Sequence, residues 1–512
     1  MLKRTILTSF VILAMTTLGV GQTITGVARP RIAMAQDGTF AIASEANIGG
    51  WGAAVQLYAP DGSPIGPLNF FEGESCSGLD IWTSDFIENI ELAFRPDGIL
   101  LVLMQHTGDL SLGGDFILSA EAAIGAIDDS GQRIDLSDGP CTVRKLIFVG
   151  GGRQDRPRMA LTPGAEVLVT ADGFFQGSNL RNVGIRVLDA NLDELIESVI
   201  PHSDALSEQS FHMFPDIATN GQLLLSTWHR CPIVDQQGNA NECDIEAQFA
   251  TVAANGLQAV GGNMTVNSGD PLGTLNIWPA AAMNASGNSV IVWGDTRTGF
   301  AGDVFGQRFN SNGEPVGGNF QVSASQGDVQ ARPEVVMLDG GGFTVAWDDS
   351  SAAGFRARAR NYDGDGNALG GPFELSAPGL QSGSPALAID GSRVSYVYLA
   401  SDGGPIQVLS NTPAVTAVED EVPPSEASAL QVYPSPFVNS TTLSYELREP
   451  AHVRIELFDI LGRLVERFTD DVRLAGRHQL SLDGTRLPVG SYVVRVQVGS
   501  KTHSKLLVRA GR

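Results

Sequence analysis

A short motif, Arg29-Pro30-Arg31-Ile32-Ala33-Met34, decides the fold because it returns along most of the chain. The other copies open at Asn89, Arg156, Phe214, Trp278, Arg332 and Ser384. A proline follows the opening residue in every copy except the second, where Ile90 takes its place. A motif that recurs at intervals of 52 to 67 residues indicates a repeat architecture, with room for inserted loops between shorter structural units.

Each copy is followed by the same succession of turns and strands. A glycine-containing turn comes first, such as Asp37-Gly38 or Asn220-Gly221, and glycine there supplies the positive φ of a tight hairpin. An apolar strand follows, for example residues 289–293, and a third strand then leads to a second turn. Each repeat therefore predicts a four-stranded antiparallel meander.

Meanders that cannot bury a face alone stack radially, so we expect an all-β chain whose residues 22–410 form a β-propeller of about seven four-stranded blades. The last repeat stops near Leu409 after three strands. Residues Thr23 to Val27 are expected to supply its missing outer strand and close the ring. An array of β-sandwiches is the alternative.

Composition supports an all-β chain and bounds its partners. Glycine is 60 of 512 residues and charged residues are 18%, which indicates many turns and few charged helical surfaces. The formal net charge of −24 repels phosphate backbones, so nucleic acid is excluded as an expected partner.

The N-terminus predicts export. A cationic start at Lys3 and Arg4 precedes a largely apolar run, typical of a signal peptide over residues 1–21 with cleavage before Gln22. Sec-dependent export to the periplasm brings the chain into an oxidising compartment, where four cysteines favour disulfides. Cys231 and Cys243 bracket a polar hairpin loop and are expected to pair, which leaves Cys76 to pair with Cys141.

A second domain follows a change in composition. Residues 411–429 are rich in Pro, Glu, Asp, Ala and Ser, and we interpret them as a semi-rigid linker. Beyond them, strands of alternating polarity predict a small immunoglobulin-like β-sandwich over residues 430–512. Its distinctive residues are Tyr433, Pro434, Pro436, Phe437, Gly462, Arg463, Gly490, Tyr492 and Lys505.

These motifs, in this order, resemble the type A sorting domain of the type IX secretion system. Ser435 stands where that family more usually has asparagine, and residues 509–512 extend past its usual end. The resemblance implies a passenger that the translocon of a Bacteroidetes-like bacterium recognises and carries across the outer membrane. It also implies a sortase that removes the domain, and release of the passenger or its attachment to anionic lipopolysaccharide at the cell surface.

One loop of the propeller has the spacing of a calcium ligand set. Asp363, Asp365, Asn367 and Glu374 match positions one, three, five and twelve of an EF-hand loop, but Ala368 replaces the glycine of the sharp turn. The preceding repeat carries polar residues at equivalent positions, which favours a hairpin turn over a metal site. The sequence predicts neither a metal site nor a cofactor.

Polar side chains recur where second strands end and first strands begin, and both ends lie on one face of a meander. We therefore expect a ligand to bind at the rim shared by Asp295, Asp348, Arg29, Arg156 and Arg332. Ion pairs between blades are the alternative role of these charges. The recurrent Trp228, Trp293 and Trp347 are expected to pack in the core.

Two functional hypotheses remain from sequence. In the first, the propeller is a non-catalytic binding or adhesion module for an unknown glycan or protein, on a secreted or cell-surface protein. In the second, it is a secreted sialidase-like glycoside hydrolase or another hydrolase with an active site at the propeller mouth. We assign no catalytic residue, because the sialidase boxes and common hydrolase motifs do not occur.

Overall fold

The protein is described from a computed structural model of the chain. The structure describes residues 10–12, 25–47, 51–72, 86–112, 115–136, 144–146, 154–173, 181–199, 210–232, 242–253, 256–271, 274–298, 302–323, 329–351, 354–375, 382–390, 393–400, 406–411, 428–433, 437, 440–447, 451–459, 464–473, 476–483, 487–488, 490–498 and 501–509. All elements in these ranges are strands, and two compact units divide the chain at residues 416 and 417.

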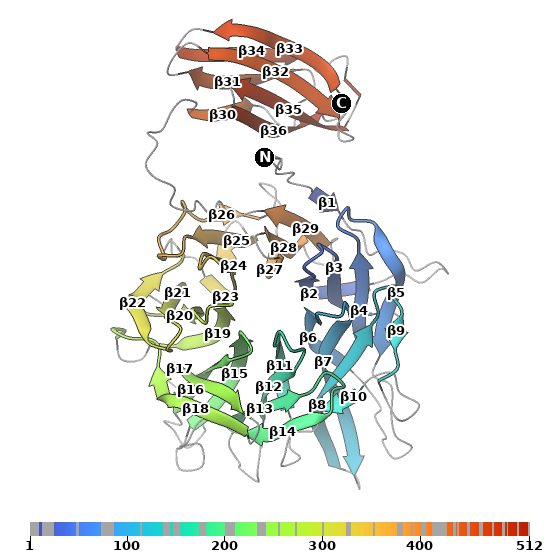
Figure 1. The fold of residues 1–512 in the computed structure, drawn as a ribbon, viewed down its shortest axis with the longest axis vertical. Helices are drawn as coiled ribbons and strands as arrows, with labels where there is room; N and C mark the ends of the chain where they lie inside the picture. The colour runs from blue at the N-terminus through green and yellow to red at the C-terminus, as the bar shows by residue number, and fades with distance from the viewer. Residues whose placement is uncertain are drawn as a thin grey trace. The chain divides into compact units, whose positions relative to one another are not determined.

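The first unit contains seven antiparallel sheets around a common centre (Figure 1). The first four sheets are β2 (Thr25–Met34), β3 (Phe40–Asn47), β4 (Trp51–Tyr58) and β5 (Pro64–Glu72); β6 (Phe86–Phe94), β7 (Leu100–Leu112), β8 (Asp115–Ile127), β9 (Arg133–Ile134) and β10 (Arg144–Leu146); β11 (Gln154–Leu161), β12 (Val167–Gly173), β13 (Asn182–Leu188) and β14 (Glu194–Val199); and β15 (Ser210–Thr219), β16 (Leu223–Pro232), β17 (Asp244–Ala253) and β18 (Gly256–Thr265).

The remaining three sheets are β19 (Asn276–Met283), β20 (Ser289–Asp295), β21 (Asp303–Phe309) and β22 (Pro315–Gln321); β23 (Val329–Met337), β24 (Phe343–Ser351), β25 (Gly354–Tyr362) and β26 (Phe373–Glu374); and β27 (Ser382–Asp390), β28 (Arg393–Ala400), β29 (Ile406–Asn411) and β1 (Phe10–Ile12). The first strand of each meander lies nearest the centre in Figure 1. This arrangement confirms an all-β, propeller-like fold.

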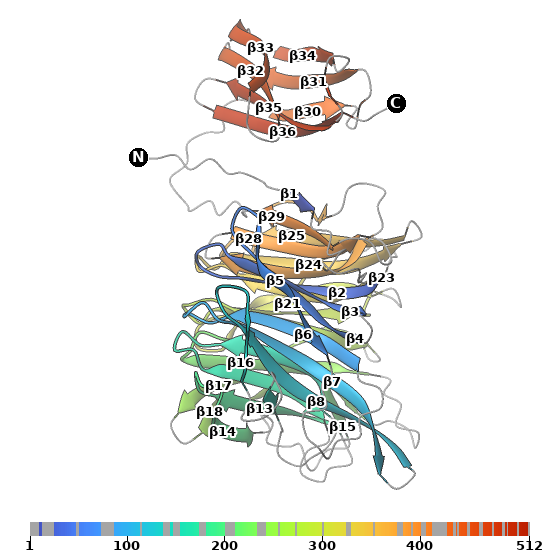
Figure 2. The ribbon, with the colours of Figure 1, turned by 90° about the vertical axis from the view of Figure 1, so that its right-hand side faces the viewer.

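Hydrophobic cores between successive sheets hold the ring together. Val290 and Val345, for example, belong to one core between the β19–β22 and β23–β26 sheets. A core containing Ile42, Tyr58 and Val397 joins the last sheet to the first, so the packing returns to its starting point. The side view in Figure 2 shows the sheets side by side around the unit.

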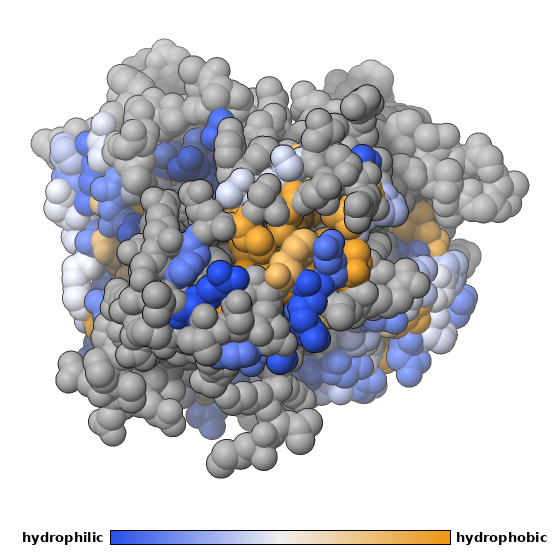
Figure 3. Space-filling model, turned by 90° about the horizontal axis from the view of Figure 1, so that it is seen from above, coloured by the Kyte–Doolittle hydropathy of each residue, from blue (hydrophilic) through white to orange (hydrophobic). Residues whose placement is uncertain are grey.

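Tryptophan lies inside this packing as the sequence predicts. Trp228 and Trp293 are 0% exposed, and Trp347 is 1% exposed. Large hydrophobic side chains that are exposed within the described ranges are scattered: Leu195, Val316 and Val465 lie on strands of three different sheets, and Leu369 lies between β25 and β26. Figure 3 shows hydrophobic residues near the centre of one face of the molecule, with hydrophilic residues beside them.

The described part of the chain includes no helix that meets the length and hydropathy of a membrane span.

Two details of the ring differ from the sequence-based expectation. The expected closure by Thr23 to Val27 is wrong, because residues 25–34 form β2, the innermost strand of the first sheet. In the precursor chain the outer position beside β29 is taken by β1, with Val11 opposite Val408, although residues 10–12 belong to the predicted signal peptide. In addition, the second sheet has five strands, since β9 and β10 both pair with β8.

The second unit contains two sheets around one core. Its strands are β30 (Ser428–Tyr433), β31 (Ser440–Leu447) and β34 (Gly476–Asp483) in one sheet, and β33 (Leu464–Arg473), β32 (Ala451–Asp459), β35 (Gly490–Val498) and β36 (Lys501–Arg509) in the other. Leu443 and Leu482 of the first sheet and Val453 and Val494 of the second belong to the same buried cluster.

Several of the sorting-motif residues stabilise this unit. Phe437 is 2% exposed and lies in the core, and the Tyr492 hydroxyl donates to the Pro488 carbonyl at 2.8 Å. Lys505 is exposed on β36, and Gly490 opens β35 opposite Arg509. Pro434, Pro436, Gly462 and Arg463 lie outside the described residues, as do most of the predicted signal peptide and linker.

Candidate binding site at the centre of the ring

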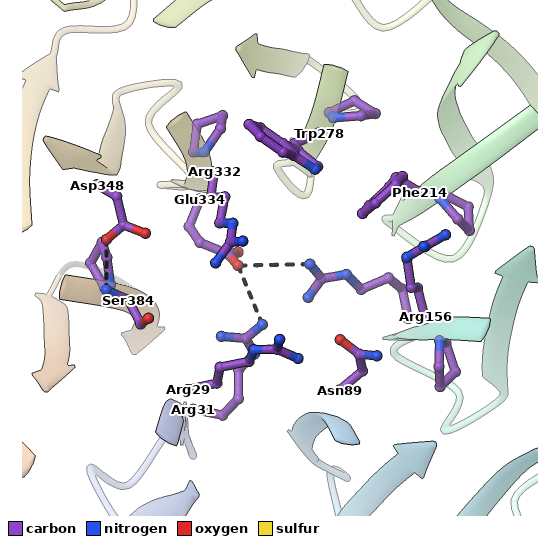
Figure 4. Close-up of a pocket in the computed structure, with 16 residues that line it drawn as sticks. Arg29, Arg31, Asn89, Arg156, Phe214, Trp278, Arg332, Glu334, Asp348 and Ser384 are labelled. Atoms are coloured by element: carbon purple, nitrogen blue, oxygen red, sulfur yellow. Dashed lines mark hydrogen bonds and ion pairs between the residues drawn. The ribbon is translucent and has the colours of Figure 1, made fainter. Parts of the chain in front are cut away.

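A cavity of ≈ 400 Å³ lies where the seven inner strands converge (Figure 4). Each sheet contributes one side chain from the equivalent position of its inner strand. We call these seven the mouth residues: Arg29, Asn89, Arg156, Phe214, Trp278, Arg332 and Ser384. They are the residues that open the seven copies of the sequence motif, so the repeat determines the site as well as the fold.

A backbone bulge explains why these side chains reach the cavity. In every sheet the pairing of the first and second strands shifts register around the mouth residue, for example between Ala331 and Glu334. All seven mouth residues have positive φ, between 43° at Arg29 and 55° at Trp278. The left-handed conformation costs a non-glycine residue roughly 1–2 kcal/mol. Because the same conformation recurs at the equivalent position of all seven sheets, it belongs to the geometry of the repeat.

Side chains from the preceding sheet accept hydrogen bonds from three of these strained backbone N–H groups. The Asn89 N–H donates to Glu45 Oε1 at 3.1 Å, and the Arg156 N–H donates to Gln105 Oε1 at 2.7 Å. The Ser384 N–H donates to Asp348 Oδ1 at 2.6 Å. A polar residue at the end of a second strand therefore links its own sheet to the next one.

Two residues further along the inner strands, four charged side chains form a closed cycle. We call Arg31, Glu91, Arg158 and Glu334 the floor network. Arg31 Nε lies 3.3 Å from Glu91 Oε1, and Arg158 contacts the same carboxylate. Arg31 Nη2 and Arg158 Nη2 lie 3.7 Å and 3.8 Å from Glu334 Oε1. Because these residues come from the first, second, third and sixth sheets, the network crosses the ring.

The charge of two half-buried acids near the cavity depends on pH. Burial raises the pKa of Asp348 to about 6, although the Ser384 N–H and the Arg332 charge act in the opposite direction. Burial likewise raises the pKa of Asp216 to about 7, against the attraction of Arg158. Both carboxyl groups are therefore partly protonated at mildly acidic pH, which reduces negative charge around the arginines.

One side of the mouth places two neighbouring aromatic rings between two cations. The Arg156 guanidinium lies 3.7 Å from the centroid of the Phe214 ring, and the Arg332 guanidinium lies 5.7 Å from that of Trp278. The two rings meet edge to face, with centroids 6.5 Å apart. Asp172 holds Arg156 with contacts at 3.0 Å and 3.2 Å, and its own side chain is fully buried. This half of the mouth offers both donors and an apolar surface.

His229 supports the aromatic side from behind. Its ring lies 4.9 Å from that of Phe214, and burial lowers its pKa to about 3. Burial also lowers the pKa of the neighbouring His212 to about 4. Both imidazoles are therefore uncharged at neutral pH and position the mouth by packing.

The structure brings together four of the five residues that the sequence places at the rim. Arg29, Arg156, Arg332 and Asp348 all line the cavity. Asp295 does not: it is 1% exposed and accepts from Trp293 Nε1 at 3.1 Å and Arg297 Nε at 2.8 Å.

The pairing of strands explains the misplacement of Asp295. Asp348 lies opposite Ala331, the residue before a mouth residue, whereas the residue opposite Ile277 is Gly294. Asp295 is thus one position beyond the equivalent of Asp348. Since side chains alternate between the two faces of a strand, a shift by one residue turns Asp295 away from the cavity.

The charges at the rim pair mainly within a sheet and not between blades. Arg29 Nη1 lies 3.5 Å from Glu45 Oε1, on the adjacent strand of the same sheet, and Arg156 pairs in the same way with Asp172. The backbone hydrogen bonds and the contacts between arginines and aromatic rings described above link neighbouring sheets at this level. Among the described residues, no carboxylate lies within ion-pair distance of Arg332.

The loop with calcium-like spacing is a hairpin turn. Asp363 Oδ1 accepts from the Asn367 N–H at 2.7 Å and Oδ2 from Asn367 Nδ2 at 3.0 Å. Glu374 instead pairs with Arg356 at 3.4 Å. Searching the described ranges for three clustered His, Cys, Asp or Glu side chains that could hold a metal gives none.

A disulfide joins Cys231 to Cys243, as the hairpin loop between them predicts, with a Cα–Cα distance of 4.3 Å. It connects β16 to the residue that precedes β17. The expected partners Cys76 and Cys141 lie outside the described residues.

The sequence analysis missed much of the cavity lining. Asn89, Phe214, Trp278 and Ser384 occupy the same motif position as the three arginines and were identifiable from the repeat alone. The floor network was not identifiable in this way, because its members meet only when distant sheets close into a ring.

Solved structures that are similar to this chain include two polysaccharide lyases and an arabinanase. A search of curated proteins finds no significant match. An ulvan lyase from a new family of polysaccharide lyase, bound to -[GlcA(1-4)Rha3S]-, is similar in structure with 12% identity and a TM-score of 0.51, covering 76% of this chain and 94% of that one. The polysaccharide lyase Uly1 gives 9% identity and a TM-score of 0.48, over 75% of this chain and 89% of that one. An α-L-arabinanase from Penicillium chrysogenum in complex with arabinobiose gives 13% identity and a TM-score of 0.40, over 64% and 93%.

At such low sequence identities, the structural similarity concerns the fold alone. The C-terminal unit, in contrast, is assigned directly by its sequence. Residues 431–509 match the family model of the secretion system C-terminal sorting domain, which confirms the resemblance to the type IX sorting domain.

Proposed function

We propose that the ring is a seven-bladed propeller that binds an acidic saccharide in its central cavity after export from the cell. The export route itself follows from the sorting domain, which indicates the cell surface or extracellular space and interaction with the type IX secretion machinery. We further propose that a signal peptide over residues 1–21 directs the preceding Sec step. The C-terminal unit, an immunoglobulin-like sandwich in our interpretation, serves as the address.

The binding proposal rests on the contrast in charge between the cavity and the chain as a whole. The chain has a formal net charge of −24, yet the cavity is lined by five arginines and only two carboxyl groups. Guanidinium groups bind carboxylates and sulfates through paired hydrogen bonds. Phe214 and Trp278 add apolar surface on which the face of a sugar ring can pack. Neutral saccharides would use only the second feature.

The test is binding by the mature full-length chain to a panel of polysaccharides: pectate, alginate, chondroitin sulfate, ulvan and neutral dextran. We expect binding to at least one acidic polymer and none to dextran, with affinity that falls as salt rises. Arg29→Ala combined with Arg332→Ala should weaken binding at least tenfold. The matched control is Arg308→Ala, which removes an arginine of β21 that does not line the cavity; its Nη1 donates to the Gly364 carbonyl at 3.2 Å. Equal binding by the mouth variant and the control would refute the proposal.

Export is tested separately by deleting residues 430–512. We expect the folded ring to stay in the periplasm of the host, as judged by cell fractionation. Surface display at the level of the full chain would contradict the role of the sorting domain.

A second candidate, hydrolysis at the same mouth, is favoured by one observation. The cavity holds two carboxyl groups in different surroundings: burial raises the pKa of Asp348 to about 6, and Glu334 lies beside two arginines. Turnover of chromogenic glycosides that is lost in Asp348→Asn and in Glu334→Gln would support this function over binding alone.

A further inference from the structure

The side chains of the floor network cross the axis of the ring. Arg158 on β11 pairs with Glu334 on β23, and these strands belong to the third and sixth sheets, so their contact spans the centre of the ring. Arg31 pairs with both acids of the network and Arg158 does the same, which leaves a four-membered cycle. In Figure 4 the side chain of Glu334 points toward the middle of the cavity and is joined by dashed lines to two guanidinium groups.

Successive sheets pack against one another through the seven hydrophobic cores that run around the ring. A polymer that entered from the mouth would therefore meet the side chains of the floor network on the axis, with packed sheets around it. Whatever reaches Arg31 and Arg158 must therefore be the end of a chain.

The volume agrees with a short occupant. At ≈ 400 Å³ the cavity lies near the lower end of the roughly 300–1,000 Å³ usual for small-molecule sites. We infer that the cavity binds the terminal acidic sugar of a saccharide chain end-on, and that it does not bind internal segments. This inference rests on the proposed function and adds to it the part of the ligand that is recognised.

The chemistry of the lining gives the terminal sugar an orientation. Arg332 is exposed and has no carboxylate partner among the described residues, so it is the arginine available for the acid group of the sugar. Trp278 lies beside it and offers the packing surface for the ring. Below them, the 3.7 Å and 3.8 Å separations at Glu334 exceed a normal hydrogen bond, so donors and an acceptor remain for sugar hydroxyls.

The experiment uses size-fractionated oligosaccharides of the acidic polymer that binds most tightly in the panel above, from one sugar to about ten, and titration calorimetry with the mature full-length chain. End-on recognition predicts that affinity per chain rises over the first one to three sugars and then stays constant. It also predicts one protein molecule per chain, at every length including the intact polymer. Affinity that keeps rising with length, or several protein molecules per polymer chain, would overturn the inference.

Two substitutions that keep the approximate shape of the side chain test whether the ligand reaches the floor network or only the mouth of the cavity. Glu334→Gln changes the floor with little change in volume, and Arg332→Met removes the acid-binding group while keeping a long side chain. Both should lower affinity at least tenfold for the shortest oligosaccharide and for the polymer alike, with melting temperatures that show the ring intact. Unchanged polymer binding in Glu334→Gln would place the ligand above the cavity and refute end-on binding. Failure of every acidic saccharide to bind would instead refute the proposed function itself.

Discussion

Replacing Asp348 with asparagine is expected to stabilise the ring at neutral pH and to leave its stability unchanged in acid. The pKa of this carboxyl group is raised from 3.8 to about 6, chiefly by burial. The folded chain thus binds the proton more tightly than the unfolded chain does, and stability declines as pH rises from about 4 to about 6 and is constant above that. A difference of about two pKa units corresponds to roughly 3 kcal/mol, and since Asp348 is only partly buried we expect about 1–3 kcal/mol.

Asparagine is a suitable replacement because its side-chain oxygen can still accept from the Ser384 N–H, which lies 2.6 Å from Asp348 Oδ1. The variant therefore loses the charge but keeps the link between the last two sheets. Below about pH 3, well under the ordinary pKa of 3.8, Asp348 is protonated in both states, and the two proteins should unfold with the same free energy.

Tryptophan fluorescence during urea unfolding measures this change in the ring alone, because all six tryptophans precede residue 348. The control is Asp349→Asn on the same strand. Asp349 Oδ2 lies 3.1 Å from Arg358 Nε, so this substitution removes an ion pair and should destabilise the ring at neutral pH. A stabilisation by Asp348→Asn that is equal in acid and at neutral pH, or no stabilisation at all, would refute the assignment of a costly buried charge.

Three further predictions concern the same molecule. Saccharide affinity should fall as pH rises through about 6, because ionised Asp348 then adds negative charge near Arg332, Arg31 and Glu334, and titration calorimetry of Asp348→Asn should show no such fall. Replacing both Cys231 and Cys243 by serine should lower the free energy of unfolding by about 3 kcal/mol, since the disulfide closes a loop of 12 residues, as urea unfolding with and without reductant can check. Gly66→Ala should destabilise the ring more than Gly317→Ala in thermal melts: both positions have positive φ, but only at Gly66 would a new Cβ meet a backbone oxygen, that of Ser130 at 2.5 Å.

The repeat made the ring predictable from the sequence because each copy carries its own strand, turn and proline signals. The same strand and turn patterns could therefore be identified in each of the seven repeats. Trp293 and Trp347 could be assigned to the core because they recur at the same place in their repeats. The same signals located Arg29, Arg156 and Arg332 at the cavity.

What failed depended on register or on distant contacts. Asp295 was misplaced because a single residue separates it from the equivalent of Asp348, and sequence spacing does not determine which residues pair across a bulge. Closure by residues 23–27 was wrong because the first inner strand already begins at Thr25. The contact of Arg158 with Glu334 joins positions 176 residues apart and follows only from closure of the ring.

The bulges of the inner strands separate what the ring recognises from what holds it together. Each mouth residue owes its position to a backbone conformation that the neighbouring residues impose, and the seven openings already include arginine, asparagine, phenylalanine, tryptophan and serine. The scaffold therefore tolerates very different side chains at these seven places while its cores stay the same. Substitutions at these seven positions can therefore change which ligand binds, in evolution or in protein design, while the rest of the ring is kept.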